Sequence, residues 1–194
     1  MKFKTINPAT EEVIGEYEIM SKDSVISAAK DFREAFNEWK QLDISERSVY
    51  FRRLAKVLRD NREEYSRYMT IEMGKPIKQA LSEVEKCAWT AEVYADNAKK
   101  WLEEETVQAD GKKHLVTFEP LGTILSIMPW NFPFWQAFRF GIPTLIAGNT
   151  SVLKHSNAVP QCALAIEDSF RKAGFPENVF RTVIADHEAT AELV

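Results

Sequence analysis

Asn131 and Arg139, in the largely apolar run IMPWNFPFWQAFRF, are two polar side chains that could take part in chemistry. An arginine within an apolar stretch needs a partner, because a buried unpaired charge is costly. That partner could be the carboxylate of a substrate, which a guanidinium binds through two hydrogen bonds, or an acidic side chain elsewhere in the fold. Asn131 stands between Trp130 and Phe132, where neither a buried strand nor a buried helix calls for an amide. The pattern alone favours the interpretation that Asn131 closes a turn.

The elements that position these residues form the first half of a predicted parallel sheet. Apolar runs and turn residues predict strands at 123–128, 150–154 and 179–184 and helices at 134–148 and 160–173. The first strand is expected to be buried on both faces, and Gly141 and Pro143 weaken the first helix. Strand, helix, strand, helix, strand is half of a doubly wound sheet, in which ligands bind beyond the carboxyl ends of the strands.

The residues before this sheet predict helices between two antiparallel hairpins. Asn7-Pro8 with the alternation after it predicts the first hairpin, and Asp110-Gly111 predicts a tight turn in the second. Asp43 with Glu46 and Asn61 with Glu64 resemble capping boxes that start helices. The predicted fold is therefore α/β: an N-terminal hairpin at 1–20, helices at 21–104, a second hairpin at 105–119 and an incomplete βαβαβ dinucleotide-binding half at 120–194.

Composition and charge exclude some classes of protein. The 194 residues are 45% hydrophobic and 28% charged, a globular balance. The net charge of -4 argues against a nucleic-acid partner, because phosphate binding needs a concentrated basic face. The sequence contains neither an apolar run long enough to span a membrane nor a signal peptide, so we expect a cytoplasmic location. Cys87 and Cys162 lie outside any CxxC pair and predict buried free thiols, and no metal site is expected.

Short motifs along the whole chain resemble the aldehyde dehydrogenase family. They are NPAT at 7–10, EMGKP at 72–76 followed by Glu83, EPLG at 119–122, IMPWNFP at 127–133, AGNTSVLK at 147–154 and AGFPENVF at 173–180. Each motif is weak alone, but their order and spacing together are specific. The runs FPFWQAFRF and LKHSNAVPQCALAIEDSF are most similar to the branch of NADP-dependent succinate-semialdehyde dehydrogenases.

The resemblance implies a role for the residues of the first strand end. In this family a cysteine thiolate attacks the aldehyde, hydride passes to a nicotinamide, and water assisted by a glutamate hydrolyses the thioester. Asn131 matches the asparagine that donates to the oxyanion of the first step. Arg139 matches an arginine that would bind the far carboxylate of succinate semialdehyde. Trp135 and Phe134 could line the substrate tunnel or only pack in the core.

The resemblance also implies a cofactor site without a GxGxxG motif, which this sequence lacks. The strand end at Met128, Pro129 and Trp130 would lie along the cofactor. The run KHSN, which is Lys154, His155, Ser156 and Asn157, matches the family's ribose-binding segment, with His155 and Asn157 in place of proline and glutamate. A glutamate would repel a 2′-phosphate, whereas the neutral Asn157 beside Lys154 would tolerate one, and His155 would add to this effect if it is protonated. We therefore expect NADP rather than NAD; the alternative for KHSN is a polar turn that caps the next helix.

No residue of this chain matches the nucleophilic cysteine or the general-base glutamate of the family. We therefore expect the amino-terminal portion of an aldehyde dehydrogenase that is inactive unless a second chain completes it. Its substrate would be a small aldehyde, and its half-built sheet and hairpins favour self-association into a homo-oligomer. Two alternatives stay open: a non-catalytic assembly or binding module derived from the family, and a plain helical scaffold.

Overall fold

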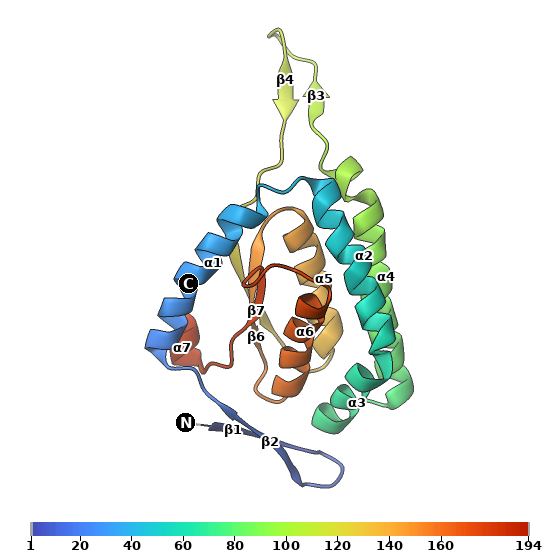
Figure 1. Ribbon diagram of the computed structural model, residues 1–194, viewed down its shortest axis with the longest axis vertical. Helices are drawn as coiled ribbons and strands as arrows, with labels where there is room; N and C mark the ends of the chain where they lie inside the picture. Colours follow the sequence, from blue (N-terminus) through green and yellow to red (C-terminus); the bar gives the residue numbers. More distant parts are fainter. Residues whose placement is uncertain (1, 194) are drawn as a thin grey trace.

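The computed structural model describes residues 2–193, which form a small parallel sheet enclosed by helices, with two separate hairpins (Figure 1). The strands are β1 Lys2–Ile6, β2 Val13–Glu18, β3 Glu105–Val107, β4 His114–Val116, β5 Thr123–Met128, β6 Thr150–His155 and β7 Phe180–Thr182. The helices are α1 Lys22–Trp39, α2 Ile44–Asp60, α3 Arg62–Met73, α4 Ile77–Trp101, α5 Pro133–Ile146, α6 Pro160–Lys172 and α7 His187–Ala191. The predicted α/β class is confirmed.

The sheet has the strand order β5-β6-β7 with all strands parallel. All six residues of the central strand β6 are buried. The expectation that β5 is buried on both faces was wrong, because the face that carries Thr123 and Ile127 is largely uncovered, whereas Ser126 on the other face is buried. Ile127, for example, is 64% exposed. The register aligns Ile127 with Lys154 and Met128 with His155, so β5 and β6 end at the same edge of the sheet.

Helices cover the sheet in layers (Figure 1). α5 and α6 pack against the strands, and α2, α3 and α4 pack outside α5 and α6. α1, with α7 beside it, contacts the same sheet through a separate apolar cluster. Successive residues of β6 point to opposite faces, so Leu153 joins the larger cluster and Val152 the smaller one. Aromatic side chains buried between these layers help to fix α5 and α6, as in the stack of Phe138, Phe170 and Phe180.

Local capping signals were right at α2 and wrong at α3. The Asp43 side chain accepts from the Glu46 backbone while the Glu46 carboxylate accepts from the Asp43 N–H, which completes the predicted capping box. Asn61 makes no such contact, because α3 follows α2 directly and Asn61 also ends α2. Its amide instead donates to the carbonyl of Val57.

The two hairpins form as predicted, but the second is looser than its sequence suggests. β3 and β4 have three residues each, and residues 108–113 form the loop instead of a tight Asp110-Gly111 turn. The Gly111 N–H donates to Nε2 of His114, so a side chain closes this loop. Figure 1 shows this hairpin projecting from the body of the molecule, while the β1–β2 hairpin lies at the opposite end.

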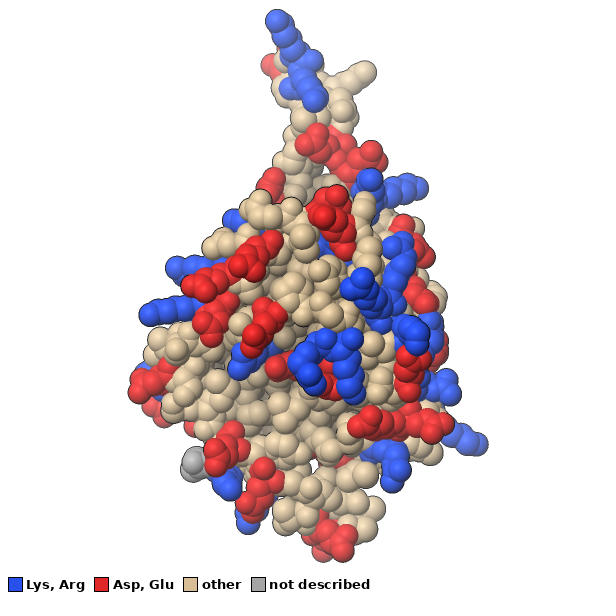
Figure 2. Space-filling model, viewed as in Figure 1, with Lys and Arg blue, Asp and Glu red and all other residues tan. Residues whose placement is uncertain are grey.

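Figure 2 shows acidic and basic side chains interspersed over the visible face, which offers no concentrated basic patch for phosphates. Within residues 2–193, every helix is too short or too polar to cross a bilayer.

Gly148, between α5 and β6, should tolerate no side chain. Its φ is +98°, and an added Cβ would lie 3.3 Å from Nη1 of the buried Arg47. We expect Gly148→Ala to lower the free energy of unfolding by about 1–3 kcal/mol, because left-handed backbone strains an L-residue. Gly141→Ala is the control, since its Cβ would meet Phe180 at 3.4 Å without a positive φ. Urea unfolding followed by circular dichroism measures both, and equal losses would contradict the backbone argument.

Candidate functional site

The loop between β5 and α5 carries Asn131 at the carboxyl edge of the sheet. α5 begins at Pro133, where a proline costs no helical hydrogen bond because the first N–H groups of a helix have no partner. The Asn131 side chain is exposed, while its backbone carbonyl accepts from Nζ of Lys75 at 3.1 Å. The residue is thus anchored through its main chain, which leaves the side-chain amide free to act as a donor.

A buried ion pair holds this loop from behind. Lys75, between α3 and α4, pairs with Glu83 on α4, and each residue is 5% exposed. The other carboxylate oxygen of Glu83 accepts from the Trp135 N–H at 2.9 Å, in the first turn of α5. The Lys75 ammonium also lies 3.8 Å from the centre of the Phe132 ring. Both charges therefore have hydrogen-bonding partners, which a buried ion pair needs to be tolerated.

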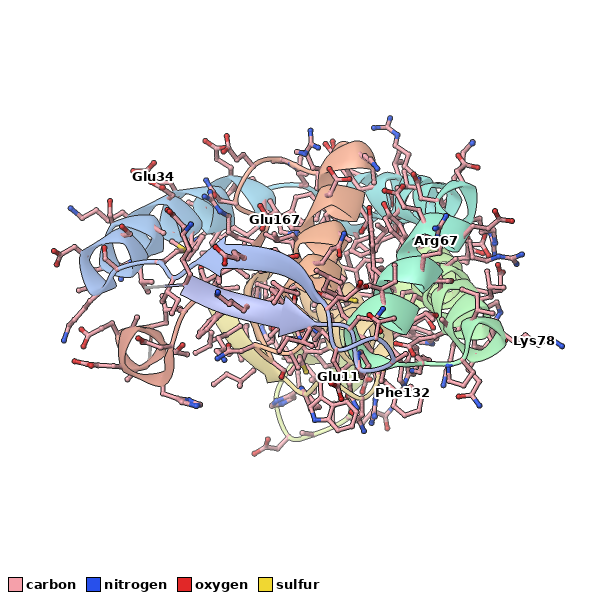
Figure 3. The ribbon with its side chains drawn as sticks, turned by 90° about the horizontal axis from the view of Figure 1, so that it is seen from below. Glu11, Glu34, Arg67, Lys78, Phe132 and Glu167 are labelled. Carbon is pink, nitrogen blue, oxygen red and sulfur yellow. The ribbon has the colours of Figure 1, made fainter. Side chains whose placement is uncertain are left out.

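The residues expected to contact the substrate separate into core and surface. Phe134 is fully buried against Tyr65 and Phe138, so it packs in the core. Trp135 is partly exposed and lines a cavity of about 440 Å³, with Lys86 over its ring at 3.8 Å. This cavity is formed by α4 and the loop, and its other lining residues are Lys78, Gln79, Ser82, Glu83 and Phe132. Figure 3 labels Phe132 and Lys78, whose side chain points outward from the first turn of α4.

Arg139 lies on α5 with an exposed side chain, which differs from the burial expected for a charge in an apolar run. The apolar residues around it face the core, whereas Arg139 occupies the outer side of the helix. Within residues 2–193 the ion pairs do not include Arg139, so the alternative of a structural ion pair gains no support there.

The end of β6 brings the KHSN residues to the same edge as Asn131. The Ser156 N–H donates to the carbonyl of Met128 at 3.0 Å, which joins the ends of the two strands. The ammonium of Lys154 donates to Oδ1 of the exposed Asn157 at 3.1 Å. Burial lowers the pKa of Lys154, opposed by the charge of Asp186. Beyond β5, Pro129 is exposed and Trp130 is 52% exposed, so both leave surface for a ligand.

His155 is neutral, so the positive charge that this position could have added is absent. Its Nε2 lies 3.0 Å from the carbonyl of Pro133, and its Nδ1 accepts from the Ser156 N–H at 2.9 Å. A carbonyl can only accept, so Nε2 carries the proton and Nδ1 carries none. Burial lowers the pKa of the ring to about 4. His155 therefore ties the two loops together and adds no positive charge to the site.

Glu72, Lys75 and Glu83 contact the segments that follow β5 and β6, although the sequence shows them only as parts of the family motifs. The Glu72 carboxylate is buried and accepts from the N–H groups of Gln161 and Cys162, the first turn of α6, at 2.8 Å each. A signal was present for Glu83, which lies on the buried stripe of α4 that includes Ala80 and Cys87. A carboxylate on such a stripe indicates a buried polar partner.

The two cysteines are free and buried, as predicted. Burial raises the pKa of Cys87 and of Cys162 well above the ordinary thiol value. Nucleophilic cysteines have lowered pKa values and partly exposed surroundings, so neither residue has the features of a nucleophile. Among residues 2–193, no group of three or more His, Cys, Asp or Glu side chains could hold a metal ion.

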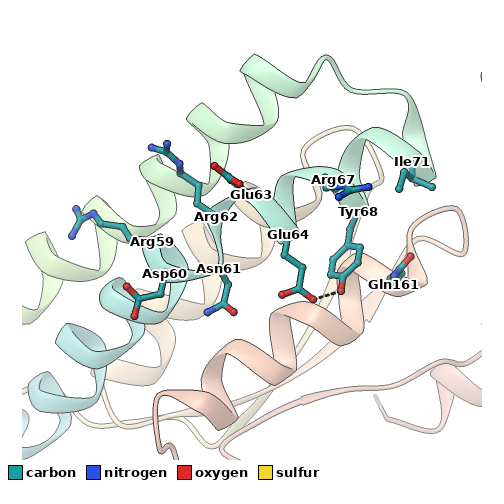
Figure 4. A pocket seen from close by; sticks show the side chains of 10 residues that line it. All are labelled: Arg59, Asp60, Asn61, Arg62, Glu63, Glu64, Arg67, Tyr68, Ile71 and Gln161. Carbon is teal, nitrogen blue, oxygen red and sulfur yellow. Dashed lines mark hydrogen bonds between the residues drawn. The ribbon is translucent and has the colours of Figure 1, made fainter.

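A large surface hollow lies elsewhere, at the junction of α2 and α3 (Figure 4). Its volume is about 670 Å³, and none of the site residues predicted from the sequence lines it. Its arginines include Arg59, which is already paired with Glu85 and Glu92. The candidate site is placed instead at the strand ends, where polar groups converge and where ligands of doubly wound sheets bind.

The chain is similar to known proteins of one family. A sequence profile described as "Aldehyde dehydrogenase family" matches residues 1–194. The chain is 43% identical over its whole length to a "Probable succinate-semialdehyde dehydrogenase [NADP(+)]" of Synechocystis, covering 43% of that protein. It is 37% identical to a "Succinate-semialdehyde dehydrogenase [NADP(+)]" of Mycobacterium leprae, with 95% of this chain and 41% of that one covered.

Solved structures show the same likeness. The crystal structure of a succinic semialdehyde dehydrogenase from Streptococcus pyogenes in complex with NADP+ superposes with a TM-score of 0.95 and is 29% identical. The superposition covers 98% of this chain and 42% of that one. The chain therefore spans about two fifths of the length of the relatives that it matches.

The neutral state of His155 predicts a pH dependence of stability. Folding lowers its pKa from 6.5 to about 4, so its contribution is complete above pH 6.5 and is lost as pH falls toward 4. Between pH 7 and 4 we expect the free energy of unfolding to fall by up to about 3 kcal/mol more in the wild type than in His155→Gln. Other buried groups such as Glu72 titrate in both proteins, so the difference isolates His155. Parallel curves from urea unfolding at several pH values would contradict the assignment.

Proposed function

Because the chain belongs to the aldehyde dehydrogenase family, we propose that it is the amino-terminal portion of an NADP-dependent enzyme that oxidises succinate semialdehyde to succinate. The observation that carries the proposal is the position of Asn131 at the carboxyl end of β5, beside the end of β6 with Lys154. An amide donor and a cationic side chain thus share the edge where ligands bind in a doubly wound sheet.

Asn131 is proposed to stabilise the alkoxide that forms when a thiolate attacks the aldehyde. Its main chain is held by Lys75 while its side chain is exposed, which suits a preorganised donor. Such a donor contributes only when negative charge develops next to it. Because Cys87 and Cys162 are buried thiols of raised pKa, we propose that the nucleophile comes from polypeptide outside these 194 residues. The chain alone is then inactive.

The residues at the end of β6 fit a cofactor with a 2′-phosphate. The Lys154 ammonium would attract the phosphate, and Asn157 offers the ribose hydrogen bonds without a negative charge that would repel it. The exposed Pro129 and Trp130, with Met128, would lie along the cofactor, and Ser156 and His155 hold the two loops in register. When bound, NADP would supply the hydride acceptor. The names of the Synechocystis and Mycobacterium leprae relatives and the complex from Streptococcus pyogenes support the same choice.

Succinate semialdehyde is proposed as the substrate from those same names and from the chemistry of α5. Arg139 has no acidic partner among the described residues, so its guanidinium can bind a distant carboxylate. The cavity beside Trp135 and Phe132 gives apolar walls for a short carbon chain.

The function is tested by assembling an active enzyme. The chain is assayed alone and combined with the product of the downstream reading frame, or with the carboxyl-terminal remainder of the Synechocystis relative. We expect NADP reduction by succinate semialdehyde only in the combined samples. Asn131→Ala should lower kcat by about 100- to 1000-fold, as loss of an oxyanion donor does elsewhere. Asn97→Ala, at an asparagine bonded within α4, is the control.

Two results would contradict the proposal: aldehyde oxidation by the chain alone, or full activity in the combined Asn131→Ala sample. Cofactor titration by calorimetry distinguishes the remaining alternative. If NADP binds neither the chain nor the combined sample, a non-catalytic assembly module explains the fold better.

Arg139→Ala should affect acidic aldehydes selectively. Loss of a charge-assisted hydrogen bond to carboxylate predicts a KM for succinate semialdehyde that is about 10- to 100-fold higher. The KM for butanal, which has the same chain length without the carboxylate, should stay unchanged. Arg171→Ala serves as the matched control, because Arg171 lies on the surface of α6 and pairs with Asp168. Equal changes for both aldehydes in Arg139→Ala would rule out carboxylate binding by this arginine.

A further inference from the structure

The Lys75–Glu83 ion pair holds two successive parts of the loop that carries Asn131. Lys75 donates to the carbonyl of Asn131 at 3.1 Å, and Glu83 accepts from the Trp135 N–H at 2.9 Å. The pair is buried, with side-chain exposures of 5% and 3%. Lys75 and Glu83 lie in the outer helical layer, whereas the loop follows strand β5 of the sheet.

We propose that Lys75 and Glu83 are positioning residues, which set the direction of the Asn131 amide by fixing its main chain on one side and the first turn of α5 on the other. This inference rests on the proposed function only in calling that amide an oxyanion donor. The contacts of Lys75 and Glu83 with residues 131–135, here called the tether, are a property of the described chain and can be measured without activity.

The contacts of the pair favour positioning over simple stabilisation. A buried ion pair adds little net stability compared with apolar side chains of the same shape, because its desolvation offsets the attraction. Its gain is geometric, since the two charges direct the acceptors and donors around them. Lys75 is directed to one carbonyl and to the Phe132 ring, and Glu83 to one N–H. All three partners lie within residues 131–135.

The Trp135 N–H gives a direct reporter. It is among the first N–H groups of α5, which have no partner within the helix, so its protection depends on Glu83. Glu83 in turn is held by Lys75. Removing the lysine should therefore release the first turn of α5 and the Asn131 carbonyl together.

The first experiment is hydrogen exchange by mass spectrometry on the 194-residue chain. Lys75→Met should speed exchange in residues 131–136 by at least about tenfold, as expected for a local opening. Lys75→Arg, which keeps the charge, should stay near the wild type. Because Lys75→Met leaves Glu83 buried without its partner, Lys75→Met/Glu83→Gln provides a charge-balanced variant that keeps an acceptor for Trp135. In this double variant we expect Trp135 to stay protected while Phe132 and its neighbours exchange faster.

Glu72→Gln is the matched control, because Glu72 is another buried carboxylate of the same layer that caps a helix. It should affect Gln161 and Cys162 and leave residues 131–136 unchanged. Faster exchange at both places in every variant would indicate general loosening and overturn the proposal. Unchanged exchange at 131–136 in Lys75→Met would overturn it as well.

The second experiment uses the combined active sample. Lys75→Met/Glu83→Gln should lower kcat by about 10- to 100-fold, since a small misplacement of a catalytic group has effects of this size, while the KM for NADP changes little. The single variant Lys75→Arg, which keeps the charge, should retain most of the wild-type kcat. An unchanged kcat would overturn the positioning role even if the exchange results hold. If the wild-type combination has no activity, the proposed function fails while the exchange experiment still decides whether the tether exists.

Discussion

The ion pair of Lys75 and Glu83 is the contact on which the arrangement at the carboxyl edge of the sheet depends. Two charges at this depth are tolerated only if their remaining hydrogen-bonding groups find partners. The Asn131 carbonyl, the Phe132 ring and the Trp135 N–H supply those partners. The loop is therefore shaped by what the buried charges require. Moving it away from α4 would remove these three partners from the two charges.

Glu72 holds the start of α6 in the same way as Glu83 holds the start of α5. It accepts from two N–H groups at the start of α6, and this helix follows the KHSN loop. Carboxylates from the helical layer thus hold the starts of both crossover helices, where the partial positive charge of a helix favours an anion. Each helix start lies just after a loop with candidate ligand-binding residues. The helices at 21–104 act as a frame that fixes where the strands of the sheet present those loops.

A feature of the fold could be predicted from the sequence when its cause lies among neighbouring residues. Helices and strands were found because their apolar periodicity is a property of neighbouring residues, and the Asp43 capping box formed for the same reason. Asn61 failed because its helix start coincides with the end of the previous helix. The exposure of Ile127 depends on how the helices cover the faces of β5, which no local pattern records. The contact of Lys75 with Asn131 spans 56 positions, so only the folded chain brings it about.

The candidate site shows the same division between local and distant causes. The placement of Asn131 and Lys154 at one edge followed from the strand pattern, because parallel strands in register end together. The charge of His155 did not follow, since its pKa depends on burial and on the carbonyl of Pro133, 22 residues away. Arg139 was expected in apolar surroundings because its sequence neighbours are apolar, yet a helix places such neighbours on another face.

A neutral His155 changes the argument for selectivity between the two nicotinamide cofactors. Without a second cation, attraction for a 2′-phosphate must come from Lys154, whose side chain bonds to the neutral Asn157. A glutamate at position 157 would stand within ion-pair distance of the same ammonium and would neutralise it. Selectivity for NADP would then arise mainly because the neutral Asn157 leaves the charge of Lys154 able to attract the phosphate. Because Lys154 is largely buried, its charge is poorly screened by solvent and would act strongly on a phosphate placed beside it.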